Sequence, residues 1–378
     1  MKKKIAIIGS GIAGLTAANL FKENSIFEVM VYEKEKTLSL EEGYGIQLAP
    51  NSIYILNKIG FSNIDNKDFF NPSKLNFYSG DSQKICDLDL SKFNSEKFKY
   101  TTLKRSVLLE FLKNNLYANN LKLGKEIKKI SKIKEKLLIN FKDNTNDLVD
   151  FIIVSDGIFS KTKSIIENKN VTPNYKGSIA IRTLLKSSKE FSYDKNNISL
   201  AMLKNAHIVI YPINKKNELN LVCIVRQKIS NNINLKDIIN EKILSQNKNL
   251  ENLFQEQLEY WPIYTSKKPI KSIYKNLFYL GDAFYAFPPA MAQGASQSIE
   301  AAFELFNLLS QQKNEVQDTY FEKRLQRTKL VNRRSTLNYY SFHLSNPIMI
   351  KFRNFILKKI TKSGKFLDSY LGSIYKKT

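Results

Sequence analysis

Three glycines near the start of the chain have a spacing suited to binding a dinucleotide. Gly9, Gly11 and Gly14 follow the apolar run at residues 5–8 in IAIIGSGIAGL. The first glycine allows a tight turn, the second lets a pyrophosphate approach the backbone, and the third lets the next helix pack on the strand. Glu33 ends the following apolar run, where it can accept hydrogen bonds from ribose hydroxyls and would repel a 2′-phosphate. The pattern predicts FAD or NAD in preference to NADP.

A second group of candidate residues lies in LGDAFYAFPPAMAQGASQSIEAA, residues 280–302. Asp282 follows an apolar run, at the strand end where open α/β sheets bind ligands, and it can accept a hydrogen bond from a ribityl hydroxyl. Pro289 stiffens the turn, and Gly294 lets a flat ring approach the start of a helix. Because an NAD dehydrogenase needs no such second site, this segment favours FAD.

Two further stretches carry side chains suited to a substrate pocket. A strand period of two places His207 and Tyr211 of HIVIYPI on one face, where an imidazole and a phenol can look into the same pocket. The alternative is a half-exposed His207 and a core Tyr211. Arg182 in IAIRTLL can pair with a substrate carboxylate in a bidentate fork, or form a surface salt bridge. The other histidine, His343, is expected in C-terminal packing.

The elements that must position these residues follow from the apolar patterns. Residues 5–8, 12–23 and 27–32 predict a strand, helix, strand unit and hence a parallel sheet. Further buried strands are predicted at 151–157 and 277–282, whereas 173–270 contains short strands typical of a mainly β module.

At this level of detail the chain resembles the single-component FAD-dependent aromatic hydroxylases, and most closely their salicylate hydroxylase-like branch. Five stretches match in order: GSGIAGL with Glu33, GYGIQLAPNSIYILNKIG, Arg105 at the head of its helix, SDGIFSKTK, and LGDAFYAFPPAMAQGASQSIEAA. HIVIYPI and the WPIY at 261–264 resemble the substrate module of that branch.

The resemblance implies roles for individual residues. It assigns FAD contacts to the glycine loop, Glu33, Arg105 and Asp282, and it implicates Asp156 and Gly157 in binding both FAD and NAD(P)H. Without it, Asp156 is a turn residue at a strand end. Gln47 lies in a loop that passes the flavin ring in the family, so it either touches substrate or stabilises a turn.

The implied reaction is a monooxygenation of the EC 1.14.13 type. NADH or NADPH reduces FAD, O2 adds to form a flavin C4a-hydroperoxide, and a small aromatic or heteroaromatic acid is hydroxylated. A base with a pKa near neutrality would activate the substrate, and His207, with Tyr211 beside it, is the predicted catalytic group.

The chain departs from the family at two positions. Tyr285, a predicted substrate contact, stands where many relatives have histidine, and Lys163 stands where they have arginine. The first change puts a proton relay at that position in doubt. The second bears on how the nicotinamide cofactor is held, because lysine lacks the planar fork of arginine.

Composition narrows the choice of compartment and partners. The net charge of +24 is spread along the 378 residues without an arginine-rich block, so we expect no nucleic-acid partner. Cys86 and Cys223 have no metal-binding or disulfide-framework spacing. The start, MKKKIAIIGSGIAGL, superficially resembles a signal peptide, but the glycine loop explains it better. We expect a cytoplasmic monomer or homodimer that binds no metal.

The predicted fold is an α/β FAD-binding domain of the glutathione reductase type, interrupted by a mainly β substrate domain and followed by a helical C-terminus. The predicted divisions are 1–71, 96–172 and 271–330 for the FAD-binding domain, 72–95 for a hairpin that joins the substrate domain, 173–270 for that domain, and 331–378 for the helical segment.

Two alternative functions stay open. A membrane-associated hydroxylase of a quinone precursor would lay PIMIKFRNFILKKI, residues 347–360, on a bilayer, whereas we expect an ordinary packed helix and no membrane partner. A flavin-fold protein that binds a ligand without turnover is the second alternative.

Overall fold

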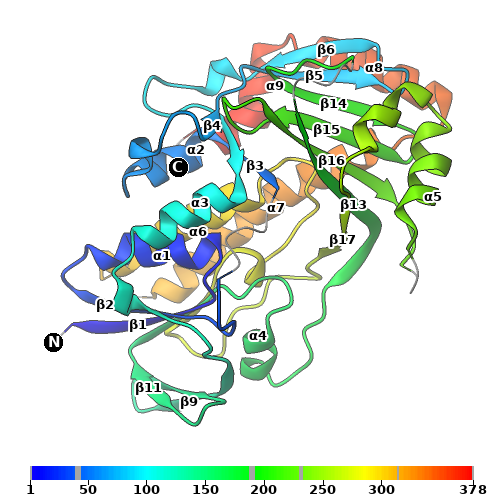
Figure 1. Ribbon diagram of the computed structural model, residues 1–378. Helices are drawn as coiled ribbons and strands as arrows, with labels where there is room; N and C mark the ends of the chain where they lie inside the picture. Colours follow the sequence, from blue (N-terminus) through cyan, green and yellow to red (C-terminus); the bar gives the residue numbers. More distant parts are fainter. Residues whose placement is uncertain (1, 39–43, 187–191, 230–232, 313–314, 377–378) are drawn as a thin grey trace.

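The structure is a computed structural model that describes residues 2–38, 44–186, 192–229, 233–312 and 315–376 (Figure 1). Gly43, the first residue of the predicted GYGIQLAPN loop, lies outside these ranges. The described strands form a parallel sheet of five strands, a mixed sheet of seven, and two antiparallel sheets of three strands each.

The five-stranded sheet carries the glycine loop. Its order is β18-β12-β1-β2-β8, and all neighbouring strands run parallel. The bounds are β1 (Lys3–Ile8), β2 (Phe27–Tyr32), β8 (Leu121–Lys122), β12 (Phe151–Val154) and β18 (Leu277–Tyr279). This arrangement confirms the predicted parallel sheet, because strands far apart in sequence end at one edge.

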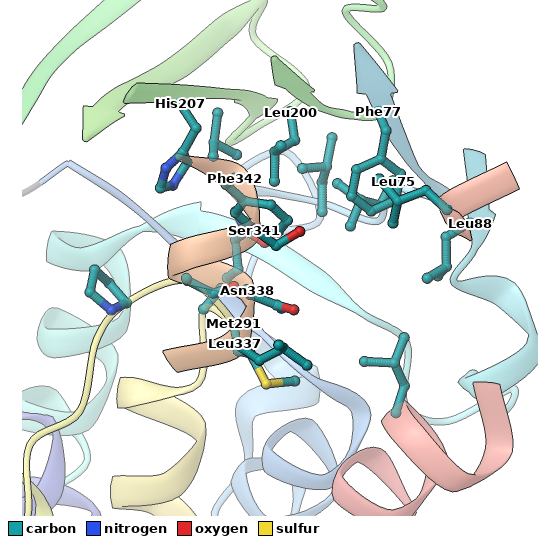
Figure 2. Close-up of a pocket in the computed structure, with 18 of the residues that line it drawn as sticks. Leu75, Phe77, Leu88, Leu200, His207, Met291, Leu337, Asn338, Ser341 and Phe342 are labelled. Atoms are coloured by element: carbon teal, nitrogen blue, oxygen red, sulfur yellow. Dashed lines mark hydrogen bonds between the residues drawn. The ribbon is translucent and has the colours of Figure 1, made fainter. Parts of the chain in front are cut away.

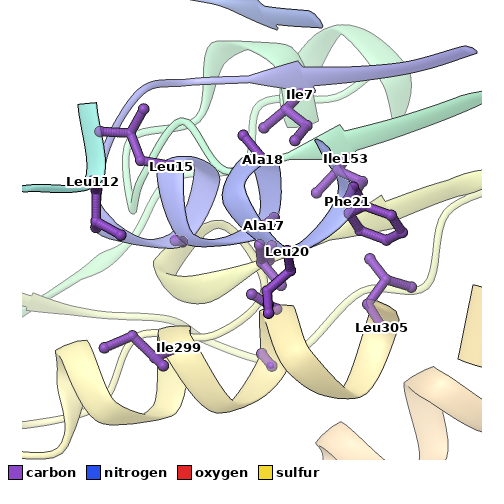
Figure 3. Close-up of a cluster of buried hydrophobic side chains, with 14 of the residues drawn as sticks. Ile7, Leu15, Ala17, Ala18, Leu20, Phe21, Leu112, Ile153, Ile299 and Leu305 are labelled. Atoms are coloured by element: carbon purple, nitrogen blue, oxygen red, sulfur yellow. The ribbon is translucent and has the colours of Figure 1, made fainter. Parts of the chain in front are cut away.

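Both faces of the parallel sheet are covered. On one face lie α1 (Ile12–Lys22), α3 (Arg105–Asn114) and α6 (Gly294–Ser310), and Figure 3 shows their apolar side chains meeting those of the sheet, among them Ile7, Phe21 and Leu305. The other face packs on the antiparallel sheet of β9 (Ile127–Ile133), β10 (Lys136–Phe141) and β11 (Asn146–Val149). Strands buried on both faces explain why their sequences are continuous apolar runs.

The seven-stranded sheet forms the upper part of the molecule in Figure 1. Its order is β17-β13-β16-β15-β14-β5-β6, and the hairpin of β5 and β6 pairs with β14 at one side. The bounds are β5 (Lys74–Ser79), β6 (Lys84–Asp89), β13 (Asn174–Lys186), β14 (Ile198–Leu203), β15 (Ala206–Pro212), β16 (Glu218–Arg226) and β17 (Glu259–Thr265). The hairpin of β5 and β6 thus belongs to the same sheet as β13–β17, although it comes about 85 residues earlier in the chain than β13.

Smaller elements connect the two large sheets. The second antiparallel sheet contains β3 (Gly45–Leu48), β4 (Phe69–Phe70) and β7 (Thr101–Lys104), in which β7 is central. The short helices are α2 (Pro50–Asn57), α4 (Lys161–Ile166) and α5 (Leu235–Ile239). Because β7 leads directly into α3, Arg105 stands at the first position of that helix.

The C-terminal helices join both halves of the molecule. Tyr320, near the start of α7 (Val316–Phe342), packs in the core of the parallel sheet, and Phe342 at its end packs under the seven-stranded sheet. The chain continues through α8 (Pro347–Ile360), α9 (Gly364–Leu367) and α10 (Ser373–Tyr375). Across the described residues, none of the helices combines the length and apolarity needed to cross a membrane.

Candidate active site

The glycine loop has the geometry that its spacing predicts. Gly9 has φ of 98°, in the left-handed region that favours glycine. A Cβ on Gly14 would lie 2.0 Å from the Gly9 carbonyl oxygen, so α1 packs closely on the loop only because Gly14 has no side chain. At Gly11 a Cβ would meet no atom within 4 Å. The loop therefore leaves open space beside Gly11, where a pyrophosphate can approach the backbone.

Glu33 lies against this loop. One carboxylate oxygen of Glu33 accepts hydrogen bonds from the Ser10 amide at 2.9 Å and from the Ser10 hydroxyl at 2.8 Å. The other oxygen accepts a bond from the Glu35 amide at 3.1 Å. The carboxylate is thus fixed at the end of β2, beside the start of α1, where the ribose of a dinucleotide would lie.

Asp156 and Gly157 stand directly behind Gly9. A Cβ on Gly9 would come within 2.9 Å of the Asp156 amide, so the two strand-end loops touch. Asp156 accepts a hydrogen bond from the Thr162 amide at 3.3 Å, near the start of α4, and burial raises the pKa of its carboxyl. Its Oδ1 is buried and has no hydrogen-bond partner among the described residues. Asp156 therefore orders the loop, and its Oδ1 can still accept a hydrogen bond from a ligand.

Asp282 lies just beyond the end of β18. A Cβ on the preceding Gly281 would lie 3.0 Å from Ala13 of α1, so this loop also packs against the start of that helix. The Asp282 side chain is open to solvent, yet protein atoms surround it, and the resulting desolvation raises its pKa to about 6. A carboxylate at the bottom of an open cleft accounts for both observations.

Lys163 connects two of these loops. It is buried, and its Nζ donates a hydrogen bond to the Ala283 carbonyl at 2.7 Å. Desolvation lowers its pKa to about 8. From α4, which follows the Asp156 loop, Lys163 thus holds the loop that carries Asp282. A backbone carbonyl needs only one donor, so lysine serves here without the planar fork of arginine.

The start of α6 forms the wall between this cleft and a large cavity. Ala292, two residues before the helix, has φ of 51°, an uncommon value for a residue with a side chain. A Cβ on Gly294 would meet nothing within 4 Å, and Gly294, Ala292 and Pro289 all line the cavity. The first amides of a 17-residue helix therefore face open space, where they favour a ligand that carries negative charge.

The cavity has a volume of about 770 Å³ and lies under the seven-stranded sheet. Its walls are mostly apolar, and Figure 2 shows Phe77 and Leu200 from the sheet opposite Leu337 and Phe342 of α7, with Met291 from the loop before α6. Tyr211, Val209 and His207 line it from alternate positions of β15, whereas Ile208 and Ile210 pack on the far side of the sheet. The predicted shared face of His207 and Tyr211 is confirmed.

Polar side chains gather at one end of the cavity. Gln47 of β3 accepts a hydrogen bond from the Tyr100 hydroxyl at 2.8 Å, and it also interacts with the Tyr211 hydroxyl. Tyr375, from the last helix of the described chain, contacts the Tyr100 ring at 5.8 Å between centroids. Burial raises the pKa of Tyr100, Tyr211 and Tyr375, so all three phenols are protonated at neutral pH.

Arg182 brings a cation to the same region. It lines the cavity from β13, and its guanidinium carbon lies 5.5 Å from the centroid of the Trp261 ring. Its charge also acts on Tyr211, whose pKa it lowers against the larger effect of burial. Arg182 Nε is buried and has no hydrogen-bond partner among the described residues. An arginine with an unused donor in an apolar cavity is suited to an anionic ligand.

His207 is paired with the other histidine of the chain. It is 2% exposed, and its Nδ1 lies 2.8 Å from Nε2 of His343. Burial, with a smaller contribution from His343, holds the pKa of His207 well below its usual range, and burial also lowers the pKa of His343 to about 3. Both rings are therefore neutral at pH 7. His343 belongs to the C-terminal packing, as expected, and it packs there against His207.

Tyr285 lies apart from the cavity. It is half-buried and packs against the apolar cluster between the parallel sheet and β9–β11, and it is not among the residues that line the cavity. The structure therefore does not bring Tyr285 together with Gln47 and Arg182. Arg105 stands at the head of α3, half-buried, with its amide donating a hydrogen bond to the Tyr44 carbonyl at 3.0 Å.

The sequence analysis missed Tyr100, Tyr375 and Asn338, which all line the cavity. Tyr100 precedes β7 and could have been noticed, since β7 pairs with the strand that carries Gln47. Tyr375 and Asn338 reach the cavity only through packing of the C-terminal helices, which no local pattern encodes.

Three observations test whether these residues fit FAD. Open space lies beside Gly11 and beside Gly294, where the backbone would meet a pyrophosphate and a flat ring. Asp156 keeps a buried oxygen that has no hydrogen-bond partner among the described residues, and Glu33 and Asp282 follow β2 and β18 of the same parallel sheet. These features match a dinucleotide that extends along the sheet edge and ends at the cavity.

Comparisons with known proteins agree with this geometry. A family model described as FAD binding domain matches residues 2–335. The 3-amino-4-hydroxybenzoate 2-monooxygenase of Streptomyces cremeus is 24% identical over 360 residues, which cover 90% of this chain and 88% of the relative. The 6-hydroxynicotinate 3-monooxygenase of Bordetella bronchiseptica is 24% identical over 329 residues, with coverages of 82% and 83%.

Solved structures share the fold. Klebsiella pneumoniae HpxO complexed with FAD and uric acid superposes with a TM-score of 0.85 at 16% identity, covering 98% of this chain and 96% of that one. A salicylate hydroxylase substrate complex gives a TM-score of 0.81 at 17% identity, with coverages of 100% and 96%. The predicted fold class is confirmed by these likenesses.

Proposed function

The chain belongs to the FAD binding domain family, and on that basis we propose that it is an FAD-dependent monooxygenase that hydroxylates a small aromatic or heteroaromatic acid with NAD(P)H and O2. Two relatives named for hydroxylation of an aminohydroxybenzoate and a hydroxynicotinate support this reaction class.

One observation carries the proposal. The same cavity is lined by the start of α6, by Tyr211 and by Arg182, whose Nε has no hydrogen-bond partner among the described residues. A substrate with a carboxylate would complete the hydrogen bonds of the guanidinium, and its aromatic ring would lie on the apolar wall.

The residues at four strand ends of the parallel sheet would hold the cofactor. Gly9, Gly11 and Gly14 admit the pyrophosphate, Glu33 binds the adenosine ribose, and Asp282 binds the ribityl chain. Arg105, Asp156 and Gly157 complete the cleft, and Pro289 and Gly294 border the ring. When bound, FAD supplies hydride acceptance from NAD(P)H and activation of O2 for transfer of one oxygen atom.

The cavity residues orient the substrate and exclude water. Arg182 binds the carboxylate, and the Tyr211 phenol, whose pKa burial raises, stays protonated and donates a hydrogen bond to a substrate oxygen. Gln47 holds the hydroxyls of Tyr100 and Tyr211 in place. The apolar wall keeps bulk water from the reacting atoms.

The catalytic role predicted for His207 stays a prediction. Its ring lines the cavity, but its depressed pKa makes it a weak proton acceptor at neutral pH. The hydrogen bond to His343 fixes its orientation, so its environment supports shaping of the cavity more strongly than general-base catalysis. The use of NADH or NADPH, the domain boundaries, a cytoplasmic location and the monomeric or homodimeric state also stay predictions.

The function can be tested by measuring how fast the purified yellow protein oxidises NAD(P)H. We expect aromatic acids to stimulate NAD(P)H consumption and to yield a product heavier by one oxygen atom in mass spectrometry. A protein that binds FAD but consumes NAD(P)H at the same rate with every aromatic acid tested would instead be a ligand-binding flavin-fold protein. Failure to bind FAD would refute the proposal itself.

A further inference from the structure

Helix α8 presents apolar side chains to solvent. Ile348 and Phe355 are 76% and 55% exposed, and Phe352 between them is 57% exposed. Positions 348, 352 and 355 recur at helical spacing and form one stripe. Of the 14 residues of α8, Arg353 alone is buried. The sequence analysis expected an ordinary packed helix here: Arg353 and Leu357 do pack on the protein, whereas this face of α8 is exposed.

Basic side chains border the stripe. Lys351, Lys358 and Lys359 are exposed, and Lys359 Nζ lies 4.6 Å from the centroid of the Phe355 ring. The sequence from 323 to 367 contains no aspartate or glutamate. An apolar stripe flanked by lysines is typical of a helix that lies in the surface of an anionic bilayer, because lysine stems reach the headgroups while the stripe is buried.

The same helix forms part of the cavity wall. Met349 and Phe352 line the cavity and are exposed. Leu337 and Tyr340 of α7 also line it and are exposed, and Leu337 is labelled in Figure 2. These four residues mark where the cavity opens between the two helices. Ile348 and Phe355 do not line the cavity, so the exposed stripe faces outward beside its mouth.

We propose that α8 docks the protein on an anionic membrane surface, with Ile348 and Phe355 inserted among the lipids and the three lysines at the headgroups. The cavity mouth then opens next to the lipid, where aromatic compounds with apolar groups concentrate. A second copy of the chain is a poorer occupant, since a two-fold contact through this stripe would bring the lysines of both copies together.

Vesicle sedimentation of the full-length, FAD-loaded protein tests this proposal. We expect binding to vesicles of phosphatidylcholine with phosphatidylglycerol, weaker binding to phosphatidylcholine alone, and loss of binding as salt is added. The double substitution Ile348→Asp and Phe355→Asp should weaken binding by at least about tenfold, because two buried apolar side chains are lost. Since neither residue lines the cavity, flavin absorbance and circular dichroism should not change.

Ile273→Asp is the matched control, because Ile273 is also an exposed aliphatic residue, at 68%, on a different part of the chain. It should bind anionic vesicles like the unmodified protein. The proposal is overturned if the folded, unmodified protein stays in the supernatant with anionic vesicles, or if the double variant sediments equally well. A dimer in light scattering that the double variant dissociates would assign the stripe to self-association and also overturn it.

Discussion

Arg182 is the cavity residue whose chemistry discriminates most sharply among substrates. Its Nε is buried without a hydrogen-bond partner among the described residues, and Trp261 covers its guanidinium plane. An anionic ligand would supply the acceptor that the buried Nε lacks, whereas a neutral ring would offer the guanidinium only apolar contact. The residue therefore selects for charge, whereas the apolar wall selects only for shape.

Replacing Arg182 by glutamine should raise the KM for an aromatic acid by about tenfold to a hundredfold, because a charge-assisted hydrogen bond is lost. FAD absorbance should be retained, since Arg182 lies outside the strand-end cleft. Steady-state kinetics with an acid and with its neutral amide provide the measurement and the control. If the acid and the amide lost the same factor, Arg182 would not be the carboxylate ligand.

The two histidines should make stability depend on pH. Because the folded state depresses the pKa of His207 and His343, the unfolded chain binds protons first as the pH falls below 6.5, the ordinary histidine value. Above that pH the two histidines do not lower the free energy of unfolding. As the pH falls toward 3, where His343 becomes protonated in the folded state, they lower it progressively.

The double variant His207→Gln and His343→Gln has no histidine left and should lose less stability between pH 7 and pH 5 than the unmodified protein. Urea unfolding at both pH values measures the difference. Parallel losses in the two proteins would contradict the assigned shifts.

We expect ionised Asp282 to lower the stability of the FAD-free protein and to strengthen FAD binding. Its pKa of about 6 in the folded state lies above the ordinary 3.8. The free energy of unfolding therefore falls as the pH rises between these two values, and the full loss applies above pH 6. Asp282→Asn should therefore raise the melting temperature of the FAD-free protein more at about pH 8 than at about pH 4.

The same variant should retain FAD less well, because the amide is a weaker acceptor for a ribityl hydroxyl than the carboxylate. Scanning fluorimetry and flavin release during gel filtration measure the two effects separately. A variant that released no flavin would exclude Asp282 from the ribityl contact.

At the scale of elements, a buried charge cluster fastens α6 to α7. Glu300 accepts a hydrogen bond from Arg324 at 2.9 Å and two from Arg327 at 2.7 Å each, and both Glu300 and Arg324 are almost fully buried. Desolvation raises the pKa of Glu300, but the two guanidinium groups outweigh it and the net pKa is lowered. The cluster lies six residues after Gly294, so it also fixes the helix start that borders the cavity.

Glu300→Gln should lower the free energy of unfolding by about 3 kcal/mol, because the buried Arg324 and the half-buried Arg327 lose their nearest carboxylate and only Glu304, 3.4 Å from Arg324, remains as a counter-charge. Denaturant unfolding measures the change. Glu322→Gln, at an exposed position of α7, is the control and should shift stability by less than about 0.5 kcal/mol. A small effect at Glu300 would mean that water replaces the carboxylate.

The sequence predicted the elements whose determinants are local. The glycine loop, Glu33 and the alternation along β15 each follow from a short pattern, and each has the expected geometry. The pairing of His207 with His343 was not predictable, because it joins residues 136 positions apart through packing of α7 under the sheet. Tyr285 was misplaced for a related reason, since its motif fixes the backbone of the loop and not the side on which each side chain packs.

At the scale of the whole molecule, the end of the chain closes one side of the cavity. Leu367, Leu371 and Tyr375 line it, and Arg334 of α7 holds this segment. Arg334 donates hydrogen bonds to the Tyr370 and Ser369 carbonyls and to the Ser373 hydroxyl. Arg334 is thus one of several α7 side chains that hold this segment against the cavity, together with Arg327, which donates hydrogen bonds to the Ser373 and Ile374 carbonyls.

Arg334→Ala should loosen this segment and admit water to the cavity. In a flavin monooxygenase, water at the reacting atoms diverts reducing equivalents to hydrogen peroxide, so peroxide formed per NAD(P)H consumed should rise by about twofold or more while FAD stays bound. Arg333→Ala is the matched control, since the neighbouring Arg333 is exposed and points away from these contacts. An unchanged peroxide yield, together with faster proteolysis after residue 360, would show that the segment is held by Arg334 but does not keep the cavity dry.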